Sequence, residues 1–319
     1  MKRGRVRLSR RELFGGLAAG AVCLGFDGRA LPAEEVPEKP ELSCGILADA
    51  QYADAKPWTN RQYRASAGKL AECVKELNGH KLDFTIHLGD FIDRDFASFK
   101  VVCPIYDKLT MPHYHLLGNH DFSVGEADKP KVLRALGLDR LGTKKGYYDF
   151  TVGRWRFVVL NGTDVSRYAN PPDSRKHEQA KAMMDELRKL RRPNLAYYNG
   201  ALGDGQIAWL KGVLVAADKA KQRVILFCHM PVFPDNNHNL YNDVQVLEII
   251  DRHPNVVAWL AGHRHAGNYA SRKGVHYLTM KGMVETHMNS FGIMQVYRDR
   301  LRLIGFGRET NRTMKTRRS

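Results

Sequence analysis

The sequence predicts an α/β fold, in which layers of helix and sheet enclose one continuous core. Three observations support this prediction. From residue 43 onward, short apolar segments alternate with segments of helical periodicity. The central apolar segments all end in clusters of Gly, Asp, Asn or His. The last three segments alternate as antiparallel strands do. The 319 residues suit one large α/β domain, and 43% hydrophobic residues exclude a wholly disordered or collagen-like chain.

The expected elements follow this order along the chain. A hairpin about Gly153 is expected to join 147–152 to 154–160. We expect Asp204 to cap a helix over 205–217, because an Asp side chain accepts hydrogen bonds from the free amides of a helix start. The other helices are expected at 60–77 and 96–109, and the other strands at 43–48, 83–88, 113–117, 223–227, 256–260, 275–280, 291–297 and 300–306.

Residues 163–203 interrupt the alternation of predicted strands and helices. This segment contains a Pro171-Pro172 pair, a charged helical stretch over 178–192 and the run Tyr197-Tyr198-Asn199-Gly200. Long insertions in compact domains are usually functional loops or lids. We therefore predict a substrate lid within a domain that extends over 34–312, followed by a basic tail over 313–319.

The first 33 residues have the layout of an export signal. Basic residues up to Arg11 precede the apolar run Leu13–Phe26, and small residues follow as far as Ala33. The run is shorter than the roughly 20 residues of a membrane span, so we expect no stable membrane anchor. Arg10-Arg11 directly before it resembles a twin-arginine signal; an ordinary signal peptide or a basic amphipathic helix are the alternatives. We expect a periplasmic or extracellular protein delivered by the twin-arginine machinery.

Charge and cysteine content narrow the function further. The formal charge is +16, of which residues 1–33 contribute +5, and the remaining 43 Lys and Arg are interspersed with 32 Asp and Glu. This dispersed surplus suits an anionic small ligand, and without a clustered basic face we expect no nucleic-acid partner. The cysteines beyond the signal show no CxxC spacing, which excludes a zinc ribbon and leaves one disulfide open: Cys44, Cys73, Cys103 and Cys228.

Five polar clusters follow predicted strands. Each alone is more typical of a turn, but open α/β sheets place their ligands at the carboxyl ends of strands, so five together predict one site. Oxygen and nitrogen ligands without thiolates suit divalent cations such as Mn or Fe and, less strictly, Zn. The clusters are Asp49-Ala50-Gln51, Gly89-Asp90-Phe91-Ile92-Asp93, Gly118-Asn119-His120-Asp121, Cys228-His229-Met230-Pro231 and Gly262-His263-Arg264-His265.

This ordered set resembles the motifs of the calcineurin-like metallophosphoesterases. Over 42–312 the chain is similar to their manganese-dependent ADP-ribose/CDP-alcohol diphosphatase subgroup. The resemblance implies a four-layer α/β/β/α sandwich of the metallophosphoesterase type. Gln51 departs from the superfamily, which usually has His at this position, but agrees with the subgroup. The residues that carry the subgroup resemblance are Gly45–Asp54, Tyr198-Asn199-Gly200, Gly282–Thr286 and Gly305–Arg308.

The resemblance also implies roles for individual residues. His120 would assist the leaving group, and Asp121 would orient His120. Asp93 would support the site by contacting its residues without binding a cation itself. Two cations about 3.5–4 Å apart would activate a hydroxide and stabilise an in-line displacement. One cation would be held by Asp49, Gln51, Asp90 and His265, and the other by Asp90, Asn119, His229 and His263, with Asp90 as the bridge.

Five residues are candidates for substrate binding. An aromatic or apolar side chain could contact a nucleobase, and an arginine could neutralise a diphosphate. The alternative is that the aromatic residues pack the insertion onto the core and that the arginine is solvated. The candidates are Trp58, Leu195, Tyr198, Asn199 and Arg308. In contrast, His80, His177, His238 and His253 are expected at the surface.

The predicted function is metal-dependent hydrolysis of the diphosphate bond in small nucleotide conjugates, such as ADP-ribose and CDP-alcohols. The resemblance implies Mn as the cation, with Fe or Zn as alternatives. A phosphodiesterase or phosphomonoesterase of the same superfamily is the first competing hypothesis. The second is a non-catalytic protein that binds phosphate or nucleic acid, which predicts missing metal ligands, whereas all seven positions are filled.

Overall fold

The computed structural model describes residues 38–316, and the chain from Lys39 onward belongs to one compact unit. The predicted export signal over 1–33, including Cys23, lies outside the described residues. Among the helices of the described range, none is long and apolar enough to cross a membrane.

Two six-stranded sheets form the centre of the unit. The first has the order β12-β11-β10-β1-β2-β3 and the second has the order β4-β5-β6-β7-β9-β8. The strands of the first sheet are β1 (Leu42–Leu47), β2 (Phe84–His87), β3 (His113–His115), β10 (Ser290–Val296), β11 (Arg300–Gly307) and β12 (Arg312–Lys315). Those of the second are β4 (Tyr148–Val152), β5 (Trp155–Val159), β6 (Arg223–Phe227), β7 (Val256–Ala261), β8 (Asn268–Arg272) and β9 (Val275–Thr279).

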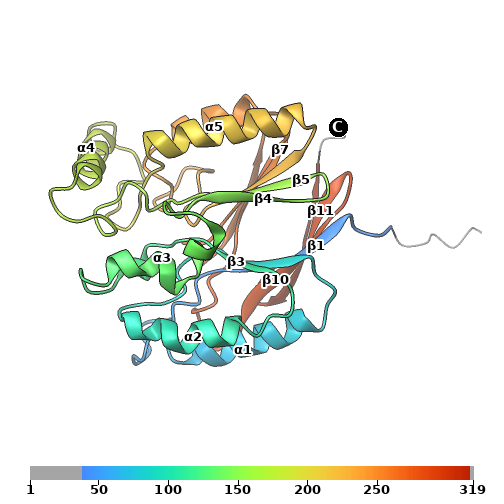
Figure 1. Ribbon diagram of the computed structural model, residues 1–319, viewed down its shortest axis with the longest axis horizontal. Coiled ribbons are helices and arrows are strands. Elements are labelled where there is room, and N and C mark those ends of the chain that lie inside the picture. Colours follow the sequence, from blue (N-terminus) through green and yellow to red (C-terminus); the bar gives the residue numbers. More distant parts are fainter. Residues whose placement is uncertain (1–37, 317–319) are drawn as a thin grey trace, which may run out of the picture. The chain divides into compact units, whose positions relative to one another are not determined.

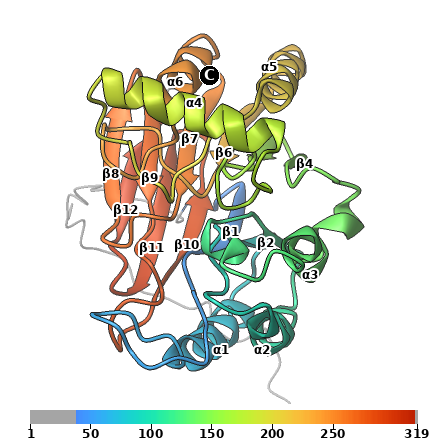
Figure 2. The same cartoon turned by 90° about the vertical axis from the view of Figure 1, so that its left-hand side faces the viewer.

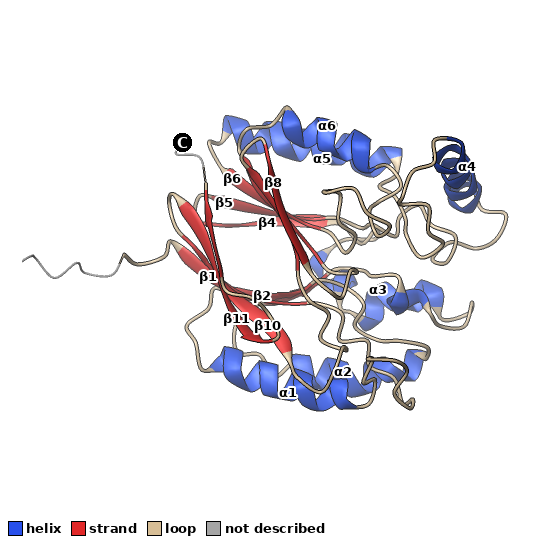
Figure 3. Ribbon diagram, turned by 180° about the vertical axis from the view of Figure 1, so that it is seen from behind, coloured by secondary structure: helices blue, strands red, loops and turns tan. Residues whose placement is uncertain are grey.

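Helices cover the outer faces of both sheets. Figures 1 and 3 show four layers, with α5 and α6 over the second sheet and α1 and α2 under the first. This arrangement confirms the predicted α/β/β/α sandwich. The helices are α1 (Ala65–Asn78), α2 (Phe99–Tyr106), α3 (Val132–Ala135), α4 (Arg175–Lys189), α5 (Asp204–Lys219) and α6 (Asp243–Asp251).

Aromatic side chains join the two sheets. Phe84 of β2 meets Phe157 of β5 edge to face, with 4.8 Å between ring centroids, and Phe150 of β4 at 5.1 Å. All residues of β1, β2, β6, β7 and β9 are buried, as expected for strands covered on both faces. The sheets are therefore fixed against each other, and so are the loops at their edges.

The insertion forms a small cluster of its own around α4. Ser174 caps this helix by accepting a hydrogen bond from the amide of His177, 3.3 Å away. The apolar face of α4 packs on both ends of the insertion, at Val165 and Ala201, and on Tyr241. Figure 2 shows α4 on the side of the molecule that also carries α3.

The structure corrects several details of the expected elements. Asp204 does not cap α5: Gly203 is the cap residue and Asp204 is the first helical residue. Residues 313–315, expected in the basic tail, belong to β12, because Met314 alternates inward and is 1% exposed. β9 lies in the second sheet, parallel to β7 and antiparallel to β8, and so does not pair with β10. The four described cysteines are free thiols.

Candidate metal centre

The register of the strands brings the five polar clusters to one edge. In the first sheet Leu47, His87 and His115 are paired neighbours at the ends of β1, β2 and β3. In the second sheet Phe227 of β6 pairs with Leu260 of β7. Each cluster begins one to three residues beyond these positions, so all of them emerge at the carboxyl edge of the sandwich.

Four of the seven candidate ligands have a strained backbone. Their φ angles lie in the left-handed region, at 55° for Asp49, 42° for Gln51, 58° for Asp90 and 68° for His263. Non-glycine residues adopt this conformation at a cost of about 1–3 kcal/mol each, and such residues concentrate at functional sites. Gly118 is required beside them, because a Cβ there would lie 2.2 Å from the amide nitrogen and Oδ1 of Asp90.

Asp49, Asp90 and His265 form the first group of converging ligands. Their candidate atoms all lie within 4.8 Å of one another. His265 Nε2 is 3.4 Å from Asp49 Oδ1. The side-chain nitrogen of Gln51, Nε2, lies 2.9 Å from Asp90 Oδ2 and 3.1 Å from His265 Nε2. The predicted first ligand set therefore converges in space.

Asp90, His229 and His263 form the second group, with ligand atoms again within 4.8 Å of one another. His229 Nε2 lies 3.1 Å from Asp90 Oδ2 and 3.2 Å from Asn119 Oδ1. Asp90 belongs to both groups, which agrees with its predicted bridging position.

Orphaned oxygen atoms show that these side chains fit divalent cations. Asp49 and Gln51 are fully buried, yet Asp49 Oδ2 and Gln51 Oε1 have no hydrogen-bond partner. A buried polar atom without a partner is costly; a cation would satisfy Asp49 Oδ2 directly, and the oxygen of Gln51 once its side-chain amide turns over. Turning the Gln51 amide over, which leaves its shape unchanged, places its oxygen where its nitrogen now contacts Asp90 and His265.

Protons compensate part of this negative charge in the metal-free protein. Burial disfavours a charged His229, but the carboxylates of Asp90 and Asp49 outweigh burial and raise the pKa of His229 to about 9. Burial likewise opposes protonation of His265, while Asp49 and Glu285 raise its pKa to about 9. A bound cation displaces such protons, because only the neutral imidazole is a ligand.

Each histidine of the centre has one ring nitrogen fixed by a neighbour. His229 Nδ1 donates to the carbonyl of Leu88 at 2.8 Å, so Nε2 is the nitrogen that offers a lone pair once the ring is neutral. His265 Nδ1 is 2.7 Å from Glu285 Oε1, and His263 Nε2 is 2.9 Å from Asn199 Oδ1. Partners of this kind fix the tautomer and the orientation of metal-binding histidines.

The structure revises the predicted partner of His120. Asp93 Oδ1 lies 2.9 Å from His120 Nδ1, so Asp93 orients this ring and Asp121 does not. Asp121 is fully buried, and its carboxylate accepts the backbone amides of Gly118 and Phe91, both at 2.8 Å. The physical reason is that a buried carboxylate needs several donors, and the loops after β2 and β3 supply them.

The predicted substrate residues lie in different environments. Trp58 is 59% exposed on a tight turn, where its backbone pairs with that of Arg61. The rings of Tyr198 and His263 meet edge to face, with 5.3 Å between their centroids. Arg308 is half-buried and donates to the carbonyl of Gly282. Leu195 is half-buried and packs on the α4 cluster. The prediction for Asn199 needs correction, because its side chain is fully buried as the partner of His263.

Two residues at the centre had no assigned role in the sequence analysis. Glu285 lies in one of the motifs that carry the family resemblance. Its Oε1 is in contact with His265 Nδ1 and lies 3.8 Å from Arg61 Nε, so Glu285 connects the turn at Arg61 to the centre. His238, expected at the surface, instead packs on His263 with 5.2 Å between centroids. Burial and Arg264 lower the pKa of His238 to about 4. Its Asn-rich loop gives no signal beyond that of an ordinary turn.

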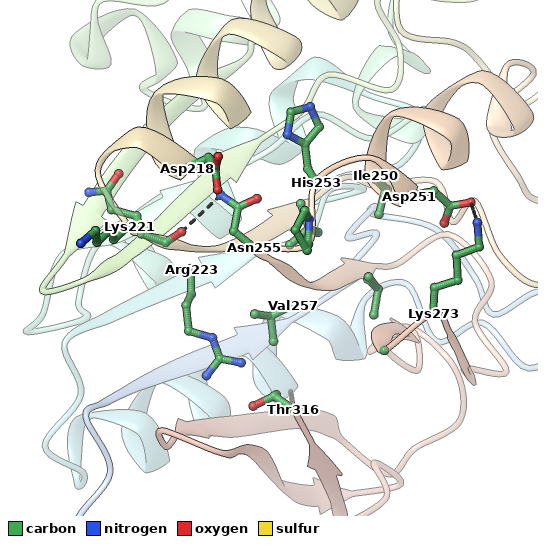
Figure 4. Close-up of a pocket in the computed structure, with 15 residues that line it drawn as sticks. Asp218, Lys221, Arg223, Ile250, Asp251, His253, Asn255, Val257, Lys273 and Thr316 are labelled. Carbon is green, nitrogen blue, oxygen red and sulfur yellow. Dashed lines mark hydrogen bonds and ion pairs between the residues drawn. The ribbon is translucent and has the colours of Figure 1, made fainter. Parts of the chain in front are cut away.

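A cavity of about 550 Å³ lies at the other edge of the sandwich and is separate from this centre. It is lined by the starts of β6, β7 and β9 and by Thr316, and Figure 4 shows Arg223, Val257 and Thr316 around it. None of the seven candidate ligands lines this cavity, so the ligand chemistry belongs to the carboxyl edge.

Comparison with known proteins agrees with this geometry. The model of the calcineurin-like phosphoesterase family matches residues 46–267. The chain belongs to the calcineurin-like phosphoesterases. Among curated relatives of this phosphoesterase, the manganese-dependent ADP-ribose/CDP-alcohol diphosphatase of Arabidopsis thaliana is 31% identical, over 85% of this chain and 96% of the relative. The protein of the same name from Mus musculus is 30% identical, over 88% and 95%.

A solved structure gives the same result for the fold. A dimetal phosphatase from Danio rerio superposes with a TM-score of 0.78 at 27% identity, over 88% of this phosphoesterase and all of that chain. GAP50 of Plasmodium, at 14% identity and a TM-score of 0.54, shares the fold alone.

The contact between Glu285 and His265 predicts an effect on metal affinity. The carboxylate of Glu285 orients His265 and raises the basicity of its ring. Replacing Glu285 with Gln removes this charge, so the affinity for Mn²⁺ should fall roughly 10–100-fold. Titration of the metal-free protein with Mn²⁺ by calorimetry measures this affinity. Glu72→Gln, an exposed change on α1, is the control. Equal affinities for Glu285→Gln and the control would show that Glu285 does not act on the centre.

Proposed function

We propose that this phosphoesterase hydrolyses the diphosphate bond of small nucleotide conjugates such as ADP-ribose and CDP-alcohols, with manganese as its cation. The observation that carries the proposal is the pair of ligand groups that share Asp90. The relatives named for this activity match the chain over nearly its whole domain, which supports the choice of substrate class.

The two ligand groups would each hold one cation, and Asp90 would belong to both. Asp49, Gln51 and His265 would hold one cation with Asp90, and Asn119, His229 and His263 would hold the other with it. Bound cations of this kind lower the pKa of water and stabilise the charge of an in-line displacement at phosphorus. The protein orients these side chains before substrate arrives, because Leu88, Asn199 and Glu285 already fix the three imidazoles.

His120 would assist the leaving group. Its side chain is 22% exposed, so it can contact substrate, while Asp93 fixes Nδ1 and leaves Nε2 for the reaction. Water adds its oxygen to one phosphorus, the bridging P–O bond breaks, and the second phosphate departs. A phosphate is a weakly basic leaving group, so a hydrogen bond or proton from His120 is sufficient assistance.

Three side chains that are exposed or half-buried would bind the remainder of the nucleotide. Trp58 and Tyr198 would stack on a nucleobase, and Arg308 would neutralise a phosphate. The α4 insertion supplies Tyr198 from the segment that follows its helix. We propose that the insertion covers bound substrate as a lid.

Hydrolysis of ADP-ribose by the metal-stripped protein tests the proposed function. With Mn²⁺ restored we expect turnover, and Asn119→Ala should lower kcat/KM by at least about 100-fold, since it removes a direct ligand rather than a supporting group. Asn255→Ala, at the opposite edge of the sandwich, is the matched control and should behave as wild type. The rates come from chromatographic detection of AMP.

Parallel rates on cyclic AMP and an aryl phosphate separate the competing activities. Much faster turnover of either compound than of ADP-ribose would contradict the diphosphatase proposal and favour a phosphodiesterase or phosphomonoesterase. Failure to hydrolyse any of the three, with Mn²⁺ shown to be bound, would contradict the proposed substrate class altogether.

We also propose that the protein is exported by the twin-arginine route, on the basis of Arg10-Arg11 before the apolar run. Residues 1–33 fused to a fluorescent protein that folds before export should direct it out of the cytoplasm of a bacterium with this machinery. The double change Arg10→Lys and Arg11→Lys should retain the fusion inside, whereas Arg5→Lys should not. Export that does not depend on the arginine pair would point to an ordinary signal peptide.

A further inference from the structure

A second pocket lies beside the metal centre at the same edge of the sandwich. Its volume is about 260 Å³. Phe122, which lines it, follows His120 by two residues, and Asn161, which also lines it, follows the end of β5. Val159 of β5 pairs with Phe227 of β6, and Asn161 and His229 each follow this pair by two residues, so both leave the sheet at the same edge. The pocket therefore lies at the edge of the sandwich that carries the second ligand group.

The charge of this pocket is positive. Lys129, Lys144, Lys145 and Lys176 line it, against the two carboxylates of Glu126 and Asp164. Lys129 pairs with Glu126, and Lys176 pairs with Asp164. Within the described part of the chain, neither Lys144 nor Lys145 forms an ion pair, and both are exposed. Two ammonium groups are therefore not neutralised by protein carboxylates.

The loop that carries these two lysines is fixed to the centre. Asn161 Nδ2 donates to the carbonyl of Lys145 at 3.0 Å, and Thr143 Oγ1 accepts the amide of Gly146 at 3.1 Å. Gly146 has a φ of 74°, and a Cβ there would lie 2.4 Å from Leu117, the residue before Gly118. The backbone of the loop is thus held against the end of β3, where Asn119 emerges.

We propose that Lys144 and Lys145 bind a third phosphate, a phosphomonoester on the half of the substrate that leaves, so that nucleotide diphosphates bearing one further phosphate are preferred. This inference rests on the proposed diphosphatase activity. The metal centre takes the two phosphates of the diphosphate and leaves the adjoining ammonium groups for an additional dianion. The position next to Phe122 places this phosphate on the side of His120. Lysine binds phosphate as a point charge, without a demand for bidentate geometry.

The test compares ADP-ribose with two phosphorylated forms, ADP-ribose 2′-phosphate and ADP-ribose 1″-phosphate. The first carries its extra phosphate on the adenosine half and the second on the terminal ribose. We expect kcat/KM for one of them to exceed that for ADP-ribose about tenfold, as two exposed charge-assisted contacts allow. The preferred isomer identifies the leaving half.

Paired variants connect this preference to the pocket. The double change Lys144→Ala and Lys145→Ala should reduce the ratio of kcat/KM between the preferred phosphorylated substrate and ADP-ribose to about one. Lys219→Ala with Lys221→Ala removes the same charge at the end of α5, beside the remote cavity, and should keep the ratio. The preference should also shrink as ionic strength rises, because exposed charges are screened.

Three outcomes overturn the inference. Equal kcat/KM for ADP-ribose and both phosphorylated forms contradicts it, and so does a preference that survives the Lys144 and Lys145 changes. A preference lost equally in the Lys219 and Lys221 control would assign it to overall charge instead of the pocket. In each case ADP-ribose is still hydrolysed, whereas no hydrolysis of any of the three compounds contradicts the proposed function itself.

Discussion

The fold of this phosphoesterase is organised around two carboxylates, Asp49 and Asp90, that are completely buried at the ends of neighbouring strands. Withdrawing a charge from water costs several kcal/mol unless partners compensate it. In this protein the compensation comes from His229, His265 and the amide of Gln51. The remaining deficit, seen as unpartnered oxygens, is what divalent cations satisfy.

Much of the surrounding structure serves to hold that arrangement. The left-handed backbone at four ligand positions turns each side chain inward directly after its strand, and the rigid sandwich bears the strain. Asp121 connects the loops after β2 and β3 through their amides. The segment around Glu285 is fixed by hydrogen bonds from the amides of Met283 and Val284 to the carbonyls of Ala48 and Asp49. These contacts thus hold the ligand side chains in their orientations.

The strand pattern was sufficient to predict an α/β fold and the convergence of the five clusters, because parallel strands end at one edge and each cluster follows a strand. The four layers and the individual ligands came from the family resemblance of the motifs. The sequence was insufficient where a role depends on distant contacts. Asp93 and Asp121 are both acids near His120 in the sequence, and only the loop geometry shows which one reaches the ring. Asn199 and His238 lie in polar loops typical of the surface, yet tertiary packing buries the first and places the second on His263. β12 is too short and too basic to stand out as a strand.

The central claim is that Asp90 joins two cations in one centre. The most direct measurement is electron paramagnetic resonance of the metal-free protein titrated with Mn²⁺. We expect two equivalents to bind and the spectrum to be that of a spin-coupled Mn pair bridged by a carboxylate. Saturation at one equivalent, or two ions with the spectra of isolated Mn²⁺, would contradict it.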